Sequence, residues 1–419
     1  MRLVHAGAAF LIGILLARSL GVEGFGAYSF ALSWILLAVS LLSAGLPQFL
    51  VREVSKNVFE GKIHQVKALI ALASSLSVKI GITVIVLLVI LAGSSDAAVH
   101  HYSTITLVIG VPAIALLVSA SMQDALTRGV GHVIRGQLSE FVARPLSHFV
   151  ILLILLYVVA ASGKLTASQA MAAFTLAASF GLATSMILRK RATNSIKVGD
   201  IAPEIPENNA SWTRQIISLA LIGWVGAINA QIGNLVLGTT GEISELSYFR
   251  VASQLSQLIP LGLIAIEAHQ APSISRLNSE GNKVLLQQLA QRNARLSLLF
   301  AAPVGIALIL LGQPILSFVF GVEFAGGTNS LNWLALGQIL NAAAGSVGVF
   351  MIAAHMERGV LIALGAATIL NVIAAIAFTP IYGAAGTAFA ACLSLACWNL
   401  IMIAKLKRHT GILSLPINL

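Results

Sequence analysis

The sequence predicts an all-α integral membrane protein with about twelve transmembrane helices in two six-helix bundles. Three observations predict this class. The 419 residues are 58% hydrophobic and only 10% charged, with a mean hydropathy of +0.92. Apolar runs close to twenty residues long, enough for a helix to cross a bilayer, recur along the whole chain. Finally, the order of short motifs in the first half returns in the second half.

The predicted spans are helices and not the strands of a membrane barrel. Barrel strands would appear as short segments in which apolar residues alternate with polar ones, and these runs do not alternate. A helix also satisfies its own backbone hydrogen bonds, which lipid cannot do. The expected spans are 3–19, 26–46, 66–93, 102–122, 141–161, 168–188, 213–238, 246–270, 297–320, 329–353, 360–380 and 384–404.

The longest connection between spans divides them six and six. It begins with the basic segment KRATNSIK and ends with the acidic, proline-containing segment DIAPEIPENN. We therefore expect an N-terminal bundle over 1–189, a cytoplasmic linker over 190–211 and a C-terminal bundle over 212–419.

The two halves repeat several short motifs in the same order. Tyr28, at the start of the second span, corresponds to Tyr248 at the start of the eighth, and Arg52 roughly matches Arg276. The pair Glu-Gly follows at 60–61 and again at 280–281. Repeats of this kind are typical of transporters built from two related halves.

The net charge of +10 is explained by membrane orientation and requires no nucleic-acid partner. With a cytoplasmic N-terminus, all but four of the 25 lysine and arginine residues fall on the cytoplasmic side. The exceptions are Arg18, Lys164 and Arg250 on the outer side and Lys79 inside a span. The positive-inside rule then places both termini in the cytoplasm. Some basic residues are also placed to touch anionic lipid headgroups.

Motifs for nucleotides and metals are missing in usable form. The two Gly-Lys pairs at 61–62 and 163–164 lack the first glycine of a P-loop, so any transport should not use ATP hydrolysis. The segment GVEGFG has the wrong glycine order for a dinucleotide site, and the adjacent histidines at 100–101 project in different directions. We expect no cofactor, no metal and no enzymatic activity.

Polar side chains gather in the seventh and eighth predicted spans. Arg250, Gln254 and Gln257 are spaced i, i+4 and i+7, so they share one face of a helix. With Asn234 they are candidates for lining a water-filled cavity. The alternative is that these groups form hydrogen bonds between helices.

Other ionisable residues fall within or near spans. Glu267 and His269 are the candidate pair for coupling transport to an ion, the alternative being that both simply meet water near the cytoplasmic end of their span. Lys79 and Asp124 are weaker candidates, interpreted as snorkelling to the membrane surface or capping a helix end.

Three segments carry a resemblance to a known family. ILLARSLGVEGFGAYSFALS, GQPILSFVFGVEFAGGTNSLNWLALGQ and TPIYGAAGTAFAACLS resemble polysaccharide-biosynthesis flippases of the multidrug/oligosaccharidyl-lipid/polysaccharide exporter superfamily. The resemblance covers nearly the whole chain. It implies two six-helix bundles in a V, with a central cavity open to one side at a time.

The resemblance also implies a substrate and partners. Such proteins move undecaprenyl-diphosphate-linked oligosaccharides from the inner to the outer leaflet of the bacterial cytoplasmic membrane, for O-antigen, capsule or exopolysaccharide. Membrane lipid and polysaccharide polymerase or assembly proteins are the implied partners. The lipid II flippase is a relative with fourteen spans, and this sequence shows no additional pair.

The resemblance gives the arginines a role, because arginine can bind phosphate oxygens with two donors at once. We expect Arg52 and Arg276 to meet the diphosphate at the inner mouth and Arg18 and Arg250 to hold it deeper, as lipid II relatives use cavity arginines. Glu23 would restrain Arg18 in the empty cavity, and the glycines of GVEGFG would allow a tight turn. The alternative is that Arg18 snorkels to headgroups while Arg52 and Arg276 only set orientation.

Two other functions compete with this one. A multidrug or organic-cation antiporter should show carboxylates in its first bundle, where this sequence offers Arg18, Lys79 and Arg144 and almost no acid. A membrane polysaccharide polymerase or ligase would be expected to carry a long outer loop, and the outer loops here are short.

Overall fold

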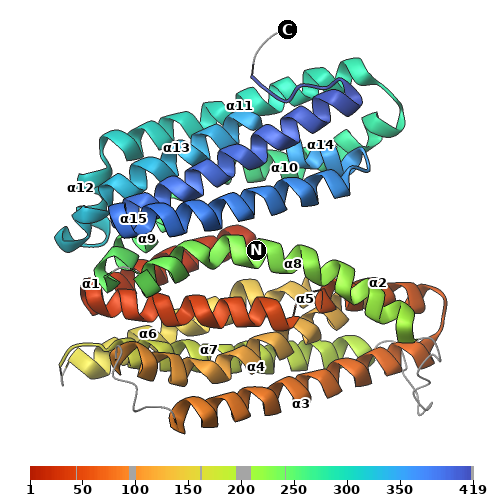
Figure 1. Cartoon of the computed structure of the whole chain (residues 1–419). Helices are drawn as coiled ribbons and strands as arrows, with labels where there is room; N and C mark the ends of the chain where they lie inside the picture. The colour runs from red at the N-terminus through yellow and green to blue at the C-terminus, as the bar shows by residue number, and fades with distance from the viewer. Residues whose placement is uncertain (44, 94–100, 161–162, 195–208, 241, 417–419) are drawn as a thin grey trace. The chain divides into compact units, whose positions relative to one another are not determined.

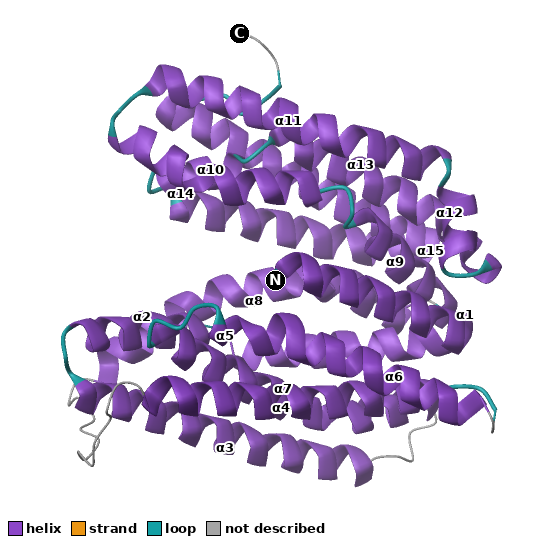
Figure 2. Ribbon diagram, turned by 180° about the vertical axis from the view of Figure 1, so that it is seen from behind, coloured by secondary structure: helices purple, strands orange, loops and turns teal. Residues whose placement is uncertain are grey.

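A computed structural model describes residues 1–43, 45–93, 101–160, 163–194, 209–240 and 242–416 of the chain (Figure 1). Helices form nearly all of this part, and no strand occurs in it (Figure 2). Contacts divide the chain into unit 1, Met1–Ala227, and unit 2, Ile228–Leu419. The predicted linker 190–211 falls mostly outside the described ranges, so a domain boundary there stays a prediction.

Unit 1 is organised around α4, which packs against α1, α2, α3 and α7. Its elements are α1 (Arg2–Ser43), α2 (Leu46–Phe59), α3 (Ile63–Gly93), α4 (His101–Gly129), α5 (Arg135–Leu138), the π-helical turn η1 (Ser139–Ala143), α6 (Arg144–Ala160), α7 (Ala167–Asn194) and the first part of α8 (Asn209–Thr240). The helix α1 is broken at Gly21, which has φ 66° and ψ −176°, and the chain reverses direction there (Figure 1). The glycine-rich seam of the sequence is therefore a tight turn, and Gly21 supplies its left-handed residue.

Unit 2 contains the second part of α8 and seven further α-helices among its described residues. These are α9 (Ile243–Ser256), α10 (Leu261–Ser279), α11 (Lys283–Leu310), α12 (Gly312–Val319), α13 (Thr328–Ala344), α14 (Val347–Ala353) and α15 (Glu357–Thr410), with the 3-10 turn η2 (Val322–Gly327) before α13. The long helix α15 also reverses direction at a glycine, Gly383, with φ 56° and ψ −134° (Figure 1).

The predicted number of spans agrees with the described helices. Eight helical stretches are long and apolar enough to cross a membrane, and two bent helix pairs raise the number to ten. Two of the eight, Val4–Phe59 and Glu357–Thr410, contain the reversals at Gly21 and Gly383, so each supplies two legs. Counted in this way, the described residues give twelve spans, and the all-α membrane fold is confirmed.

The ninth span begins earlier than predicted. The helix α11 covers Lys283–Leu310, whereas the sequence indicated 297–320. Asn282 fixes the start, because its side-chain oxygen accepts a hydrogen bond from the backbone N–H of Leu285 at 3.1 Å. The first turns of α11 are rich in glutamine and arginine, so the apolar run begins well inside the helix. A prediction based on that run therefore placed the start of the helix too late.

The internal repeat is visible in the geometry of one turn. Gly61 and Gly281 have φ values of 69° and 68°, which place both in the left-handed region. Each ends a helix with the same pair of backbone hydrogen bonds, the Schellman motif. The bonds, donor first, are Gly61 to Val58 and Lys62 to Asn57 in unit 1, and Gly281 to Asn278 and Asn282 to Leu277 in unit 2.

This shared turn fixes the register between the two halves and corrects one predicted match. Aligning Gly61 on Gly281 pairs Tyr28 with Tyr248, as the sequence indicated. The same alignment pairs Arg276 with Lys56, because each lies five residues before its turn glycine. Arg52 is one helical turn further away, so it is not the counterpart of Arg276.

A glycine allows α8 to pack on the corner between α1 and α2. Gly45 has φ 77°, and a Cβ atom on it would lie 2.5 Å from the backbone oxygen of Ile216. Beside this contact, Nε1 of Trp224 donates to the backbone oxygen of Leu41 at 2.9 Å. The first part of α8 therefore belongs to unit 1.

The segment that follows α15 is fixed along unit 2, and we call residues 412–416 the C-terminal strap. The side chain of Gln287 bonds the backbone of Leu413 twice, donating to its oxygen at 3.0 Å and accepting from its N–H at 2.8 Å. The hydroxyl of Ser414 is buried and donates to the backbone oxygen of Ala344 at 2.7 Å. The strap thus ties the chain end to α11 and to the end of α13.

Candidate functional site

Two of the four candidate arginines lie in unit 1, at different positions along its helices. Arg18 is exposed on the first leg of α1, three residues before the break at Gly21. Arg52 is exposed on α2. Residues 22–43, the second leg of α1, separate them and are about 33 Å long by helical rise. The two arginines therefore mark two separate positions and not one binding site.

The predicted polar stripe of the eighth span is carried by α9 in unit 2. Arg250 and Gln254 lie one turn apart and are both half-buried. The helix ends at Ser256, and the chain bends by 46° before α10. Gln257 lies in this bend and is exposed, so it does not belong to the helical face that carries Arg250 and Gln254.

The candidate coupling pair and the fourth arginine lie on α10. Glu267 is half-buried, whereas His269 is exposed. Residues two apart on a helix do not face each other, so the structure does not bring these two side chains to one face. Arg276 is 74% exposed and forms an ion pair with Glu280 one turn later, at 3.5 Å.

Amide side chains join the helices inside unit 2. Nδ2 of Asn371 on α15 donates to Oδ1 of Asn229 on α8 at 3.0 Å, and the hydroxyl of Ser394 lies 3.5 Å from the same oxygen. Asn234 is buried nearby along α8 and donates to Oε1 of Gln231 at 3.3 Å. Its own Oδ1 has no hydrogen-bond partner within the described residues. For Asn229, hydrogen bonding between helices is therefore the observed role.

The reversal of α15 is held by a glutamate that the sequence analysis did not single out. The backbone N–H of Ala384 donates to Oε2 of Glu245 at 2.7 Å, which caps the second leg of α15. A Cβ atom on Gly383 would lie 2.5 Å from the same oxygen. The glutamate and its partner are 139 residues apart, so no local pattern could have revealed the contact.

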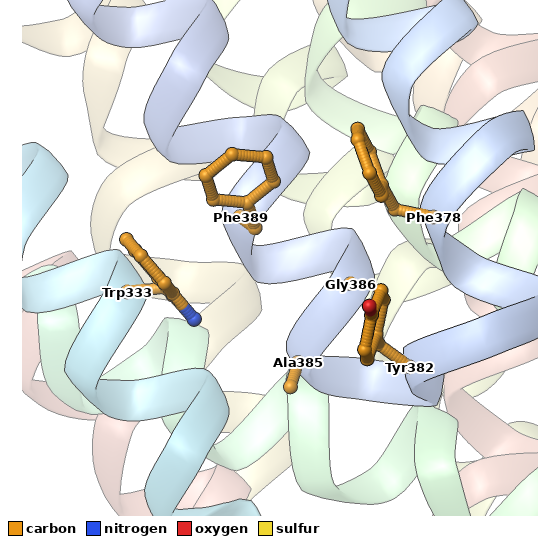
Figure 3. Close-up of a pocket in the computed structure, with 6 residues that line it drawn as sticks. All are labelled: Trp333, Phe378, Tyr382, Ala385, Gly386 and Phe389. Atoms are coloured by element: carbon orange, nitrogen blue, oxygen red, sulfur yellow. The ribbon is translucent and has the colours of Figure 1, made fainter.

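An aromatic pocket of about 240 Å³ lies beside this reversal, lined by Trp333, Phe378, Tyr382, Ala385, Gly386 and Phe389 (Figure 3). Phe389 stands between Trp333 and Phe378, with edge-to-face ring distances of 4.9 and 5.2 Å. Trp333 comes from α13 and the other residues from both legs of α15. None of the six carries a charge, so the pocket offers no position for a diphosphate.

A buried polar cluster in unit 1 is the site that sequence reasoning missed. Asp124 on α4 is only 3% exposed, which contradicts its interpretation as a snorkelling or capping residue. Its carboxyl group hydrogen-bonds Ser185 of α7. Ser185 is bonded to Ser139 of η1, with 2.7 Å between the two hydroxyl oxygens. The cluster therefore links α4, α7 and the π-helical turn.

Further ionisable groups surround this cluster. Arg128, Glu140 and Arg144 all interact electrostatically with Asp124. The ring of His5 from α1 packs edge-on against Phe141 of η1, with 5.5 Å between centroids. The signal in the sequence that could have revealed this cluster is Asp124 itself, because an ionisable residue inside a membrane helix is seldom without a function or a partner.

His148 on α6 adds a second buried ionisable side chain to the same region. It is 7% exposed, and its ring packs edge-on against Phe174 at 5.6 Å. Its Nε2 atom has no hydrogen-bond partner among the described residues. Arg144 interacts electrostatically with this ring and with Asp124, so the group forms one electrostatic unit.

Comparison with known proteins gives a family for the sequence. Residues 1–277, well over half of the chain, match the family described as polysaccharide biosynthesis protein. No curated protein sequence matches the chain.

Solved structures share the fold over nearly the whole length. An inward-facing multidrug resistance MATE family transporter of the MOP superfamily superposes with a TM-score of 0.77 and 14% identity, over 98% of this chain and 95% of that one. The lipid II flippase MurJ, in an inward closed conformation, gives 0.74 and 16%, over 96% and 86%. A MOP superfamily transporter from Pyrococcus furiosus gives 0.65 and 14%, over 98% and 94%. At these identities the likeness establishes the fold.

Proposed function

The chain belongs to the polysaccharide biosynthesis protein family, and on that premise we propose that it moves a lipid-linked oligosaccharide across a membrane. The substrate is an undecaprenyl-diphosphate-linked repeat unit of O-antigen, capsule or exopolysaccharide, carried from the inner to the outer leaflet of the bacterial cytoplasmic membrane. Both chain ends face the cytoplasm, in keeping with the distribution of lysine and arginine.

The observation that carries this proposal is the half-buried arginine of α9. Arg250 lies inside a membrane span, with Gln254 one turn away on the same face. A cation at that depth is costly unless it faces a partner or a polar cavity. Arg250 can bind the diphosphate of such a substrate, because guanidinium binds phosphate oxygens in a bidentate fashion.

The other predicted residues supply a path for the diphosphate. Arg52 in the middle of α2 and Arg276 in the last turn of α10 are exposed cations, and they receive the headgroup before it leaves the inner leaflet. Arg18 and Arg250 then hold it deeper, with Gln254, Gln257 and Asn234 offering hydrogen bonds to the glycan. Glu267 and His269 stay candidates for ion coupling, each acting alone because they occupy different faces of α10.

A cation antiporter is the second candidate, since the fold is shared with multidrug transporters. A cation antiporter should carry carboxylates in its first bundle, and Asp124 is such a carboxylate. However, Asp124 is buried and lies in the field of Arg128 and Arg144, which repel an organic cation. The charge around this acid therefore favours the anionic substrate.

The test is flipping of undecaprenyl-diphosphate-linked oligosaccharide in proteoliposomes, scored by access of the glycan to an impermeant glycosidase. We expect Arg18→Ala and Arg250→Ala each to slow flipping about tenfold or more, because a charge-assisted bond to phosphate contributes about 1.5–3 kcal/mol. Lysine at either position should restore part of the rate, since it keeps the charge but loses the bidentate geometry.

Arg191→Ala is the matched control, because Arg191 is an exposed arginine of α7 outside the proposed path. It should flip substrate at the rate of the unmodified protein. Full activity in both the Arg18→Ala and the Arg250→Ala proteins would overturn the arginine path. Absence of any flipping by the unmodified protein, at the purity and lipid content at which it stays folded, would overturn the substrate.

A further inference from the structure

A short chain of hydrogen bonds runs from α4 to α7 inside unit 1. The hydroxyl of Ser139 donates to the backbone oxygen of Gly181 at 2.7 Å. The hydroxyl of Ser185 donates to Oγ of Ser139, also at 2.7 Å. The carboxyl group of Asp124 hydrogen-bonds Ser185. Ser139 and Ser185 are almost fully buried, so no water replaces these bonds.

The direction of this chain is fixed by the group at its end. The backbone oxygen of Gly181 can only accept, and it would repel another lone pair at 2.7 Å, so the proton of Ser139 must lie between the two oxygens. Ser139 can then only accept from Ser185, which uses the single proton of that hydroxyl. The bond between Asp124 and Ser185 therefore needs its proton from the carboxyl group of Asp124.

The surroundings of Asp124 agree with a neutral acid. Its Oδ1 atom is buried and has no hydrogen-bond partner in the described part of the chain. An ionised carboxylate would leave a full acceptor oxygen unsolvated, whereas a protonated one leaves a much weaker acceptor. The charges that interact with it are Arg128 on the same helix, Glu140 on η1 and Arg144 on α6, and none of them is hydrogen-bonded to Oδ1.

The helices around α4 carry other ionisable groups that could respond to a charge at this position. They are His5 on α1, Glu53 on α2, Lys67 on α3, Arg135 on α5, Glu140 on η1, Arg144 and His148 on α6, and Arg189 on α7. Arg144 is the one best placed to receive the charge. Its side-chain stem packs against α7 at Gly181, where a Cβ atom would lie 3.3 Å from Cβ of Arg144.

We propose that Asp124 is a proton-binding site of unit 1, and that proton release rearranges the contact between α4, η1 and α7. On release the O–H bond of Asp124 breaks, the proton passes to water, and the carboxylate remains. Ser185 then loses its donor, and the carboxylate attracts the guanidinium of Arg144. The inference rests on the proposed function in one respect, that the proton gradient drives export of the lipid-linked oligosaccharide.

The π-helical turn gives this switch a mechanical output. In Ser139–Ala143 each backbone hydrogen bond spans one residue more than in an α-helix, and such turns are frequently found at functional positions. Ser139 at its start bonds α7, while Arg144 directly after its end interacts with Asp124. A change in the partner of either residue shifts α6 relative to α7.

Infrared difference spectroscopy of the full chain in lipid nanodiscs tests the proton without any substrate. The unmodified protein should show the C=O band of a protonated carboxylic acid in neutral buffer, and Asp124→Asn should remove it. Glu53→Gln and Glu140→Gln are matched controls that should keep it. Ser185→Ala should shift the band, because the acid loses its acceptor. A spectrum unchanged by Asp124→Asn would overturn the proposal.

The rearrangement is tested by distance measurement between spin labels at Leu146→Cys on α6 and Met186→Cys on α7, both exposed positions, after removal of Cys392 and Cys397. We expect the distance to change between acidic and alkaline buffer and to stay constant in Asp124→Asn, whose amide still donates to Ser185. An equal change with pH in both proteins would overturn the switch.

A flipping assay then connects the site to transport. Loss of the response of flipping to an imposed pH gradient in Asp124→Asn is the expected result, and a full response would overturn the coupling. Because the infrared and distance measurements use no oligosaccharide, failure of the unmodified protein to flip this substrate would refute the proposed function and leave the proton site standing.

Discussion

Unit 1 and unit 2 share a helical repeat but bury different chemistry. Among the described residues, the almost fully buried acidic and histidine side chains are Glu53, Asp124 and His148, and all three lie in unit 1. The polar side chains buried to the same degree in unit 2 are asparagine, serine and threonine, with Asn371 and Asn399 joining helices. The almost fully buried side chains of unit 1 can therefore change their charge, and those of unit 2 cannot.

This difference shows how a duplicated fold can divide its tasks. Hydrogen bonds between amides and hydroxyls do not change with pH, so those of unit 2 stabilise one arrangement of helices. An acid surrounded by arginines has two arrangements, one for each protonation state. The shared turn at Gly61 and Gly281 shows that the backbone repeat survived while the buried side chains diverged.

The largest effect should come from placing a charge among the uncharged buried side chains of unit 2. Asn371→Asp sets a carboxylate against Oδ1 of Asn229, which accepts a bond at 3.0 Å in the unmodified protein. A buried charge without a partner costs about 3–5 kcal/mol, so thermal unfolding in detergent should occur at a clearly lower temperature. Acidic buffer should restore part of the loss, because the neutral acid can donate. Asp124→Asn should lose much less, and equal losses would contradict the comparison.

A smaller effect is expected from removing one polar side chain from each interior. Asn399 donates to Oδ1 of Asn341 at 3.0 Å, and Asn399→Leu removes this donor from the half-buried Asn341, at a cost of about 1–3 kcal/mol. His148→Phe removes a nitrogen that has no partner in the described structure and keeps the ring beside Phe174, so it should change stability by less than about 1 kcal/mol. The reverse order of the two unfolding temperatures would contradict this reading.

The turns that the units share should respond equally. Gly61→Ala and Gly281→Ala meet no atom within 4 Å, so each should cost only the left-handed penalty of about 1–2 kcal/mol. His355, with φ 57°, already bears that penalty. His355→Gly should therefore stabilise unit 2 by up to about 1 kcal/mol, net of the added flexibility of glycine. Unequal losses at the two glycines would show that the turns are not equivalent.

The smallest effect belongs to the exposed pair beside the first of these turns. Lys62 hydrogen-bonds Glu60 and lowers the pKa of that carboxyl group below its usual value. A lowered pKa adds stability above the usual glutamate range, and that stability is lost as the pH falls through the lowered value. Because the pair is exposed and screened by salt, Glu60→Gln should not measurably change the unfolding temperature at neutral pH. A clear shift would contradict this assignment.

The fold could be predicted from the sequence because its signals are local. Apolar runs give the spans, and the Glu-Gly pairs at 60–61 and 280–281 give the repeated turn. The start of α11 was misplaced because its first turns are polar. The link from Asp124 to Ser185 joins residues of two helices, and Glu245 bonds Ala384 from 139 residues away in the sequence, so neither contact leaves a periodic pattern.

The C-terminal strap determines where the sidedness of the chain can be measured. A thiol at position 414 would be shielded by the fold, because Ser414 is buried against Ala344. A lack of reaction with an impermeant reagent would therefore reflect burial and would not show on which side of the membrane the residue lies. A reporter protein used to determine sidedness should be attached after the strap, since truncation before Leu413 would remove the partner of Gln287. Lys407 and Arg408, at the end of α15, are exposed. At these positions the reaction of a thiol with an impermeant reagent should depend on the side of the membrane and not on burial in the fold.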